Sequence, residues 1–304
     1  MELRSRPFAG EADVRRVVDF VAAITTHGSR AVYWYVGDVL WALYQNVVYD
    51  PSKHVYLWED AGGALRGFAF YHPPGRVDFQ VDPRFNDAEL LAEEILCWAE
   101  EYRRGFGADA DGTRALTTEA YDDDAARIAQ LQRRGYTRSD FSLLDMRRDL
   151  SVPTPDPAPP PGMLVRPVAG EDEYAARVAI HREVWHPSKV TLEAYRRLRT
   201  APGYRPELDL VAVAEDGAFA SYCICWLDAA NRIGEFEPVG TRAAFRRRGA
   251  GKAVMLEGLR RLREHGVTTA AVISLASNAA SVALYESVGF RTAQRSYEWL
   301  VTSD

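Results

Sequence analysis

The chain has 304 residues, a formal net charge of −6 at pH 7, and 47% hydrophobic and 26% charged residues. These values are ordinary for a soluble globular protein, and the length is sufficient for two domains. No apolar run approaches the roughly 20 residues that cross a bilayer, and the N-terminus lacks the apolar stretch of a signal peptide. We therefore expect a cytoplasmic protein that binds no membrane, and the negative charge argues against non-specific nucleic-acid binding.

The proline-rich segment 151–162 divides the chain almost equally. Half of its residues are proline, so no regular hydrogen-bonded ladder can form there, and we interpret it as a semi-rigid polyproline linker. Residues 1–150 precede this linker and residues 163–304 follow it. We expect each of these two segments to form one domain.

The two segments share sequence markers near both ends. The hexapeptide RPFAGE at residues 6–11 recurs as RPVAGE at residues 166–171, an offset of 160, and Gly135-Tyr136 recurs as Gly289-Phe290, an offset of 154. Because the order and the spacing agree at both ends, we interpret the segments as copies of a duplicated domain.

Hydrophobic periodicity in the second segment predicts alternating strands and helices in chain order. We expect a strand at 163–168, helices at 173–185 and 191–199, strands at 208–214, 218–227 and 233–241, a helix at 250–264, a strand at 268–275, a helix at 279–287 and a closing strand at 291–301. Gly266 would end the third of these helices. The expected fold class is α/β of the mixed α+β kind, with a mixed, mostly antiparallel sheet flanked by helices in each domain.

The cysteines and histidines form no recognisable metal site. No second Cys or His pair accompanies Cys223 and Cys225 at metal-ligand spacing, and we interpret both as small core residues on one face of a strand. Cys97 stands alone. The histidines form no ligand cluster and are His27, His54, His72, His181, His186 and His265.

A basic, glycine-containing segment joins the strand that ends near residue 241 to the helix that begins near residue 250. Gly249 and Gly251 let the backbone approach a ligand, and the free N–H groups of a helix start attract anions. The surrounding positive charges are Arg242, Arg246, Arg247, Arg248 and Lys252. A pyrophosphate fits this arrangement, although many basic helix starts bind nothing.

Two motifs together resemble the GNAT superfamily of N-acetyltransferases. The pyrophosphate motif of that family, Arg/Gln-x-x-Gly-x-Gly/Ala, is matched by Arg246, Gly249 and Gly251. Its second motif, an Asn near a helix start, a Tyr seven residues later and then Gly-Phe, is matched by Asn278, Tyr285 and Gly289-Phe290. Both motifs stand in the family's order within residues 163–301, whereas the first segment matches only in outline.

The resemblance implies an enzyme that transfers an acetyl group from acetyl-CoA, or another acyl group from its CoA thioester, to a primary amine. The strand before the motif would pair with the pantetheine arm through Val239, Gly240 and Thr241. The pyrophosphate would be held by Arg246, Arg247, Arg248, Gly249, Ala250, Gly251 and Lys252. Asn278 would contact the pantetheine or the adenosine, and Tyr285 would protonate the departing thiolate. A plain helix N-cap for Asn278 and a core ring for Tyr285 are the alternatives.

The reaction also needs a base, because an amine arrives protonated. Glu235 and Glu237 lie on one expected strand, and their spacing places both carboxylates on the same face. Glu235 precedes Arg246 by eleven residues, where some members of the family carry a catalytic glutamate. Neighbouring carboxylates in a desolvated cleft raise each other's pKa. We favour Glu235 as the base, with Glu237 binding the cationic acceptor; a solvated edge strand is the alternative.

The first segment keeps the outline but loses these motifs. Aligning Phe85 with Phe245 places Asn86 at the arginine position and Glu89 and Leu91 at the glycine positions; Asp124 and Leu131 fall at the Asn and Tyr positions. We therefore expect no cofactor there, and a role in shaping the acceptor cleft. Aromatic residues that could line such a cleft are Tyr33, Trp34, Tyr35, Trp41, Tyr44 and Tyr49.

The tandem layout is similar to that of the mycothiol synthases, in which an inactive-looking copy precedes an active one. This analogy concerns architecture alone and leaves the acceptor open. We expect acetylation of a small-molecule amine by direct attack in a ternary complex. A non-catalytic acyl-CoA-binding regulatory module, a protein-lysine acetyltransferase and an interaction protein that inherited the fold are the alternatives.

Overall fold

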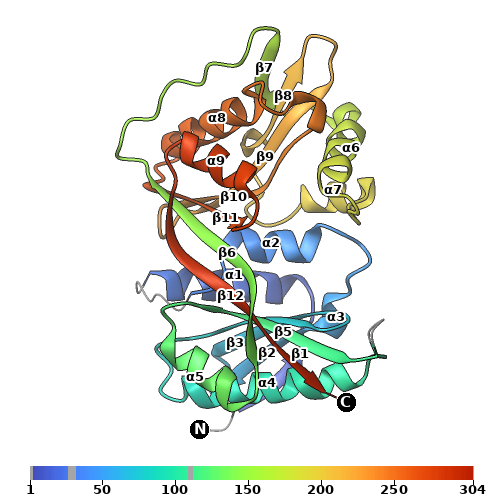
Figure 1. Cartoon of the computed structure of the whole chain (residues 1–304), viewed down its shortest axis with the longest axis vertical. Coiled ribbons are helices and arrows are strands. Elements are labelled where there is room, and N and C mark those ends of the chain that lie inside the picture. The colour runs from blue at the N-terminus through green and yellow to red at the C-terminus, as the bar shows by residue number, and fades with distance from the viewer. Residues whose placement is uncertain (1–2, 27–31, 109–111, 304) are drawn as a thin grey trace.

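The computed structural model describes residues 3–26, 32–108 and 112–303, which form alternating helices and strands (Figure 1). The helices are α1 (Glu11–Thr25), α2 (Val36–Tyr44), α3 (Pro51–His54), α4 (Ala88–Arg104), α5 (Ala125–Arg133), α6 (Tyr174–Val184), α7 (Leu192–Leu198), α8 (Ala250–Glu264) and α9 (Ala279–Ser287). The strands are β1 (Leu3–Pro7), β2 (Val55–Asp60), β3 (Leu65–His72), β4 (Arg76–Val81), β5 (Arg114–Tyr121), β6 (Thr137–Asp149), β7 (Met163–Pro167), β8 (Asp209–Ala214), β9 (Phe219–Asp228), β10 (Ile233–Thr241), β11 (Thr269–Leu275) and β12 (Arg291–Ser303).

Every element expected in the second segment is present, with ends that agree to within two residues. The bounds of β10, α8 and α9 are those expected. Local chemistry explains the agreement, because α8 ends where Gly266 adopts a φ of 79° and Val267 N donates to Leu262 O at 3.1 Å.

All strands belong to one mixed sheet of twelve strands, in the order β1-β2-β3-β4-β5-β12-β6-β11-β10-β9-β8-β7. The described pairs are antiparallel except β4–β5 and β10–β11. We call β1–β5 with α1–α5 the N-terminal lobe and β7–β11 with α6–α9 the C-terminal lobe. The expected fold class, tandem α/β units with mostly antiparallel sheets and flanking helices, is confirmed.

The long strands β6 and β12 are exchanged between the lobes (Figure 1). Strand β6, from the first segment, pairs with β11 of the second, and β12, from the second segment, pairs with β5 of the first. They also pair with each other. The sheet therefore continues across the lobe boundary, and the division of the chain at 151–162 into separate domains stays a prediction.

Both copies of the shared hexapeptide make the same hydrogen bonds. Arg6 forms a bidentate ion pair with Asp13, whose Oδ2 accepts from Ala9 N at 2.7 Å. Arg166 forms the equivalent pair with Glu173, whose Oε2 accepts from Ala169 N at 2.8 Å. The same local network in both lobes supports the interpretation as a duplication.

One hydrophobic core spans both lobes. Leu40 and Leu43 of α2 are buried in the same cluster as Leu198 of α7 and Trp226 of β9. Burying each of these aliphatic side chains stabilises the folded state by about 1.5–3 kcal/mol. The packing of α2 against the C-terminal lobe is therefore a stabilising contact between the lobes. In Figure 1, α1 and α2 lie between the strands of the N-terminal lobe and the C-terminal lobe.

Cys223 and Cys225 are buried beneath α8 in a second core, as expected, and neither forms a disulfide. Across the described ranges, no group of three or more His, Cys, Asp or Glu side chains could hold a metal ion. Over the same ranges, no helix combines the length and the apolar character needed to cross a bilayer. His27 lies outside the described residues.

Candidate active site

Strand β10 separates from β11 halfway along its length. The two strands pair in parallel only over 233–235, whereas on its other side β10 pairs with β9 as far as Thr241, with a bulge between Phe236 and Val239. Within the described residues, the backbone of 236–241 thus has no strand partner on the β11 side. An extended ligand could pair with those groups. This central position also excludes the alternative of a solvated edge strand for β10.

The backbone after β10 turns sharply into α8. Arg247 and Gly249 have φ values of 62° and 86°, and Gly249 is the N-cap of α8 with no side-chain hydrogen bond. The N–H groups of the first turn therefore remain available. A Cβ on Gly251 would lie 2.8 Å from Thr241 Oγ1, so glycine allows α8 to begin against the end of β10.

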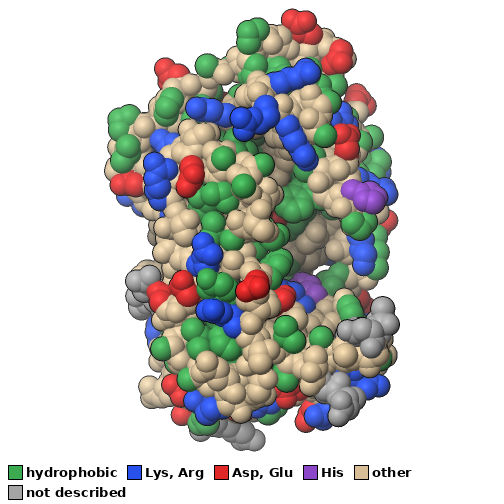
Figure 2. Space-filling model, in the orientation of Figure 1, with side chains coloured by type: hydrophobic (Ala, Val, Ile, Leu, Met, Phe, Trp, Pro, Cys, Tyr) green, Lys and Arg blue, Asp and Glu red, His purple; other side chains and the backbone are tan. Residues whose placement is uncertain are grey.

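Positive side chains surround these N–H groups. Arg246, Arg247, Arg248 and Lys252 are exposed, and Figure 2 shows Lys and Arg side chains gathered on the C-terminal lobe. Free N–H groups, a helix dipole, two glycines and guanidinium groups together fit a pyrophosphate. The linker also reaches this turn, since a Cβ on Gly249 would lie 3.2 Å from Pro160 Cγ.

The second motif forms α9 and the turn after it. Asn278 is exposed and caps α9 by accepting from Ser281 N at 3.2 Å, which is the plain N-cap geometry. Tyr285 is buried in the core beside Phe290, with 6.2 Å between ring centroids. Its hydroxyl has no hydrogen-bond partner in the described part of the chain. Burial, followed by the charge of Glu237, raises the pKa of Tyr285 above its usual range.

Glu235 is buried at the boundary between the lobes. It is 3% exposed, and its Oε2 has no hydrogen-bond partner among the described residues. The first turn of α2 lies against it, because a Cβ on Gly37 would be 2.3 Å from that oxygen. Burial raises the pKa of Glu235 well above its usual value, and the charge of Asp38 and a side-chain hydrogen bond with Asp38 raise it further.

Glu237 lies in the bulge of β10, where its backbone oxygen accepts from Trp226 Nε1 at 2.7 Å. Burial and the charge of Asp38 raise the pKa of Glu237 to about 8. Both glutamates thus lie near Asp38, and the charge of Glu237 also reaches Tyr285. The bulge removes the simple alternation that was expected to place the two carboxylates on one face.

A cavity of about 220 Å³ adjoins Asp38 at the lobe boundary. Its lining residues come from both lobes and from the exchanged strands: Tyr33, Trp34, Asp38, Trp41, Ala42, His72, Arg76, Asp78, Glu119, Tyr121, Leu143, Asp145, Ile273 and Ser296. The space-filling view shows the surface hollowed between the lobes (Figure 2). Of the aromatic residues expected at a cleft, Tyr33, Trp34 and Trp41 line this cavity, whereas Tyr35, Tyr44 and Tyr49 do not.

The sequence profile of the acetyltransferase (GNAT) family matches residues 171–290, the part of the chain that carries β10, α8 and α9. This part of the chain is a GNAT acetyltransferase domain. Mycothiol acetyltransferase of Kineococcus radiotolerans is 29% identical over 258 residues, covering 79% of this chain and 78% of its own length. The corresponding protein of Streptomyces coelicolor is 34% identical over 157 residues, covering 49% and 50%.

Solved structures share the fold of the whole chain. A tandem GNAT protein from the clavulanic acid biosynthesis pathway superposes with a TM-score of 0.70 at 19% identity and covers 100% of both chains. A GCN5-related N-acetyltransferase from Sphaerobacter thermophilus gives a TM-score of 0.68 at 20% identity, covering 99% of this chain and 95% of its own. The tandem architecture is therefore shared along the whole chain.

The N-terminal lobe has a shorter turn where the C-terminal lobe has its basic turn. Phe85 N donates to Asp82 O at 3.0 Å just as Phe245 N donates to Arg242 O at 2.9 Å, so the expected alignment of the two phenylalanines is confirmed. The helix N-cap then follows after two residues at Asp87 but after four at Gly249. Counted from the two N-caps, Asp87 falls at the position of Gly249 and Glu89 at that of Gly251. Leu91 is therefore not at a glycine position as expected, because two residues are missing from this turn.

Arg127 occupies the place between β4 and β5 in the N-terminal lobe. Its guanidinium lies 3.8 Å from the centroid of the Phe79 ring and donates to Phe79 O at 3.4 Å and to Thr118 Oγ1 at 3.3 Å. Arg127 is three residues after the N-cap Asp124, and Ser281 is three residues after the N-cap Asn278. The C-terminal lobe therefore has a small side chain where the N-terminal lobe has a buried arginine.

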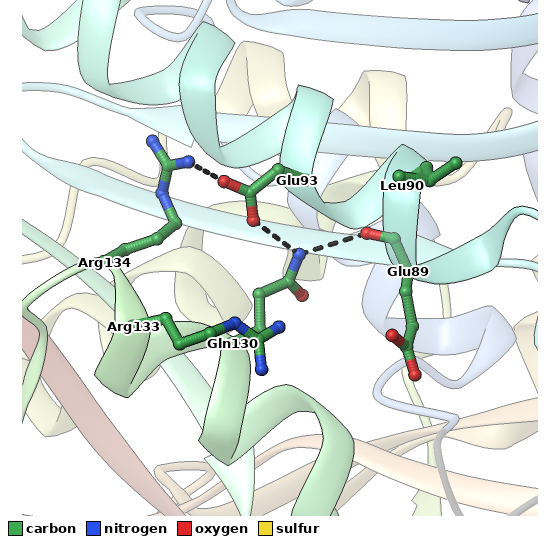
Figure 3. Close-up of a pocket in the computed structure, with 6 residues that line it drawn as sticks. All are labelled: Glu89, Leu90, Glu93, Gln130, Arg133 and Arg134. Atoms are coloured by element: carbon green, nitrogen blue, oxygen red, sulfur yellow. Dashed lines mark hydrogen bonds and ion pairs between the residues drawn. The ribbon is translucent and has the colours of Figure 1, made fainter.

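Side-chain contacts also join α4 to α5 in the N-terminal lobe. Figure 3 shows the shallow pocket between these helices, where Gln130 Nε2 donates to Glu89 O at 3.1 Å and to Glu93 Oε2 at 2.9 Å. Arg134 pairs with the other oxygen of Glu93. These contacts occupy the polar groups of α4 that lie closest to α5.

Sequence analysis placed Glu235, Glu237 and Tyr285 in one region, and the structure brings them together with the turn before α8 on a single lobe. Sequence analysis did not identify Gly37 and Asp38, which α2 brings to Glu235 from the N-terminal lobe. The only local signal was a Gly-Asp pair directly after the aromatic cluster at 33–35. That pattern does not reveal which part of the chain a helix start will contact.

Proposed function

We propose that this protein transfers an acetyl group from acetyl-CoA to the primary amine of a small molecule by direct attack in a ternary complex. The carrying observation is that two buried carboxylates lie on β10, the strand that leads into the turn before α8, and that Asp38, whose charge reaches both, lines the cavity at the lobe boundary. An acyl donor held on one side and an amine held on the other would meet at these carboxylates. The relatives named mycothiol acetyltransferases support a small-molecule acceptor.

Acetyl-CoA would be held mainly by the C-terminal lobe. Val239, Gly240 and Thr241 offer backbone groups for the pantetheine, and the turn Arg246-Arg247-Arg248-Gly249-Ala250-Gly251-Lys252 offers N–H groups and charge for the pyrophosphate. Asn278 would contact the pantetheine or adenosine while it caps α9. The bound thioester supplies an acyl carbon that a neutral amine can attack.

Proton transfer would be divided between two groups. Glu235 would remove the proton from the acceptor ammonium, because its raised pKa brings it closer to that of an amine. Tyr285 would donate a proton to the departing sulfur, since burial, followed by the charge of Glu237, raises the pKa of its hydroxyl. Glu237 would bind the cationic acceptor, because a nearby ammonium group favours the ionised form of a carboxyl group.

We infer that the N-terminal lobe binds no acyl-CoA. Its turn before α4 lacks two residues and both glycines, and Arg127 fills the place between β4 and β5. The lobe instead contributes most of the residues that line the cavity, and it places α2 against Glu235. Its role is to complete the acceptor site.

The proposal is tested by incubating the protein with acetyl-CoA and a panel of small-molecule amines while free thiol is detected. Thiol release that depends on an amine, with a mass increase of one acetyl group on that amine, is the expected result. Glu235→Gln should lower kcat with little change in the Kd for acetyl-CoA. Glu264→Gln, an exposed change at the far end of α8, is the matched control.

Other outcomes of the same assay separate the alternatives. Tight acetyl-CoA binding without turnover on any amine would instead indicate a regulatory module. Turnover on lysine-containing peptides but on no small amine would indicate a protein-lysine acetyltransferase. Absence of acetyl-CoA binding by calorimetry would remove the proposal entirely.

A further inference from the structure

We propose that Asp38 of the N-terminal lobe is a positioning residue for Glu235, and that the two carboxyl groups act as one proton-accepting pair across the lobe boundary. This inference rests on the proposed function, since it assigns a partner to the base of that reaction. It makes the N-terminal lobe a necessary part of the proton-transfer machinery, although that lobe lacks the features of an acyl-CoA site.

The contact is built by the first turn of α2. Gly37 brings the backbone so close to Glu235 that a Cβ atom would lie 2.3 Å from Glu235 Oε2 and 2.5 Å from Trp226 Cδ1. Asp38 follows directly, and its carboxyl group is close enough for its charge to raise the pKa of Glu235. Because Gly37 has no side chain, the first turn of α2 can lie directly against Glu235.

Neighbouring groups hold Asp38 in place. Its Oδ2 accepts from Tyr35 N at 2.9 Å, so one oxygen is fixed by the turn that begins α2. The Tyr35 hydroxyl donates to Asp145 Oδ1 at 2.9 Å and accepts from Arg147 Nε at 3.0 Å, which ties this turn to β6. Asp38 also lines the cavity proposed to hold the acceptor.

The charges around Asp38 are mostly negative. The titratable or charged groups that face the pair are Tyr35 on its own helix turn, Glu237 on β10, Asp78 on β4, and Asp145 with its ion-pair partner Arg147 on β6. The arginines near the pair are bound to other acids: Arg147 to Asp145 at 2.7 Å, and Arg76 of the cavity to Asp78 at 2.7 Å. His72, which also lines the cavity, lies 3.4 Å from Asp78. Neither Asp38 nor Glu235 has a salt bridge within the described residues, so an acceptor ammonium would supply the missing positive charge.

The pKa values agree with this geometry. Burial raises the pKa of Asp38 to about 6, and burial together with the charge of Asp38 raises that of Glu235 well above its usual value. Removing the charge of Asp38 should lower the pKa of Glu235, since like charges disfavour ionisation.

The proton balance of the reaction is complete with this pair. The acceptor ammonium gives one proton to the Asp38–Glu235 pair and becomes a neutral amine. The amine nitrogen forms a bond to the acyl carbon while the carbon–sulfur bond breaks, and Tyr285 protonates the leaving sulfur. The new amide nitrogen then loses one proton to solvent, and solvent reprotonates Tyr285. The Asp38–Glu235 pair releases to solvent the proton that it accepted from the ammonium.

Asp38→Asn tests the pair, because the asparagine side chain has nearly the same size but no charge. The acidic limb of the pH profile of kcat/KM should move to lower pH by about one unit, which is typical for the loss of one neighbouring charge. The KM for acetyl-CoA should stay within about twofold, since Asp38 lies away from the turn that precedes α8. Asp38→Ser, a smaller neutral side chain, should shift the limb in the same direction.

Glu264→Gln, an exposed change at the far end of α8, is the matched control. It removes one negative charge far from the pair, so the acidic limb of kcat/KM should stay at its wild-type position. If the wild-type enzyme is active and both neutral variants at position 38 keep the wild-type limb, the carboxyl pair is wrong while the proposed function stands. If the wild-type enzyme acetylates no amine, the proposed function fails and this inference fails with it.

Discussion

A Cβ atom on Gly37 would lie 2.3 Å from Oε2 of Glu235, although the two residues belong to different lobes. Side chains almost never approach so closely, so only glycine fits at this point of α2. The close approach places the start of α2, which carries a partial positive charge, next to the buried carboxylate of Glu235.

Gly37→Ala should therefore damage catalysis more than cofactor binding. The added methyl group would push α2 away from β10 or rotate the Glu235 side chain, and a displacement of about 1 Å can cost about 100-fold in rate. We expect kcat/KM for the amine to fall about 10- to 100-fold with little change in the Kd for acetyl-CoA, measured by steady-state kinetics and calorimetry. Gly170→Ala is the control, because a Cβ there meets nothing within 4 Å. Equal effects of both substitutions would contradict the prediction.

Gly251→Ala should weaken the binding of acetyl-CoA. A Cβ at this position would lie 2.8 Å from Thr241 Oγ1 and 3.2 Å from Leu284 Cδ2, so the start of α8 would have to move away from β10. We expect the Kd to rise at least about tenfold, or about 1.4 kcal/mol, in isothermal titration calorimetry. Gly266→Asn at the other end of α8 should bind normally, since asparagine tolerates a positive φ. Unchanged affinity of Gly251→Ala would argue against a pyrophosphate at this turn.

Tyr285→Phe separates a catalytic hydroxyl from a plain core ring. If the hydroxyl protonates the departing sulfur, kcat should fall about 100-fold, the lower range for general acid catalysis, while the melting temperature changes little. Stopped-flow thiol detection and thermal unfolding would measure the two quantities. Tyr297→Phe, on β12, is the control and should keep the wild-type kcat. A Tyr285→Phe enzyme with full activity would support the core-ring alternative.

Glu237 should make the folded protein lose stability as the pH rises. Its pKa in the folded state is raised to about 8, whereas an unfolded glutamate titrates near 4.3. The folded state therefore binds this proton more tightly than the unfolded state does. As the pH rises from about 4.3 to about 8, the free energy of unfolding falls by about 1.4 kcal/mol per pH unit. Urea unfolding at pH 6, 7.5 and 9 should show a steeper decline for the wild type than for Glu237→Gln. Parallel declines would mean that Glu237 titrates normally.

The isolated fragment 163–304 should not fold. Strands β11 and β12 would both lose β6, and β12 would also lose β5, which leaves unpaired strand edges that favour aggregation. We expect no cooperative thermal transition by circular dichroism and a large aggregate fraction by size-exclusion chromatography, with the full chain as control. A soluble fragment with a sharp unfolding transition would show that the second segment is an autonomous domain.

Much of the C-terminal lobe was predictable because its signals are local. The periodicity of 250–264 predicted α8, and Gly266 marked its end, since both depend on residues within a few turns of each other. The correspondence between Asp124 and Asn278 was also predictable, and both residues cap their helices. The length of the turn before α4 was not predictable, because no local sequence pattern reveals a two-residue deletion. The deletion shifts the alignment of Glu89.

The sequence by itself determined the secondary structure of the C-terminal lobe, the turn that precedes α8 and the presence of two carboxylates on β10. Each of these depends on a short continuous stretch whose backbone preferences and residue spacing act locally. Only the tertiary structure decided that β6 and β12 are exchanged and that Gly37 and Asp38 lie against Glu235. Strand exchange and helix docking minimise exposed strand edges and apolar surface across the whole chain, and no local pattern encodes which distant segments will meet.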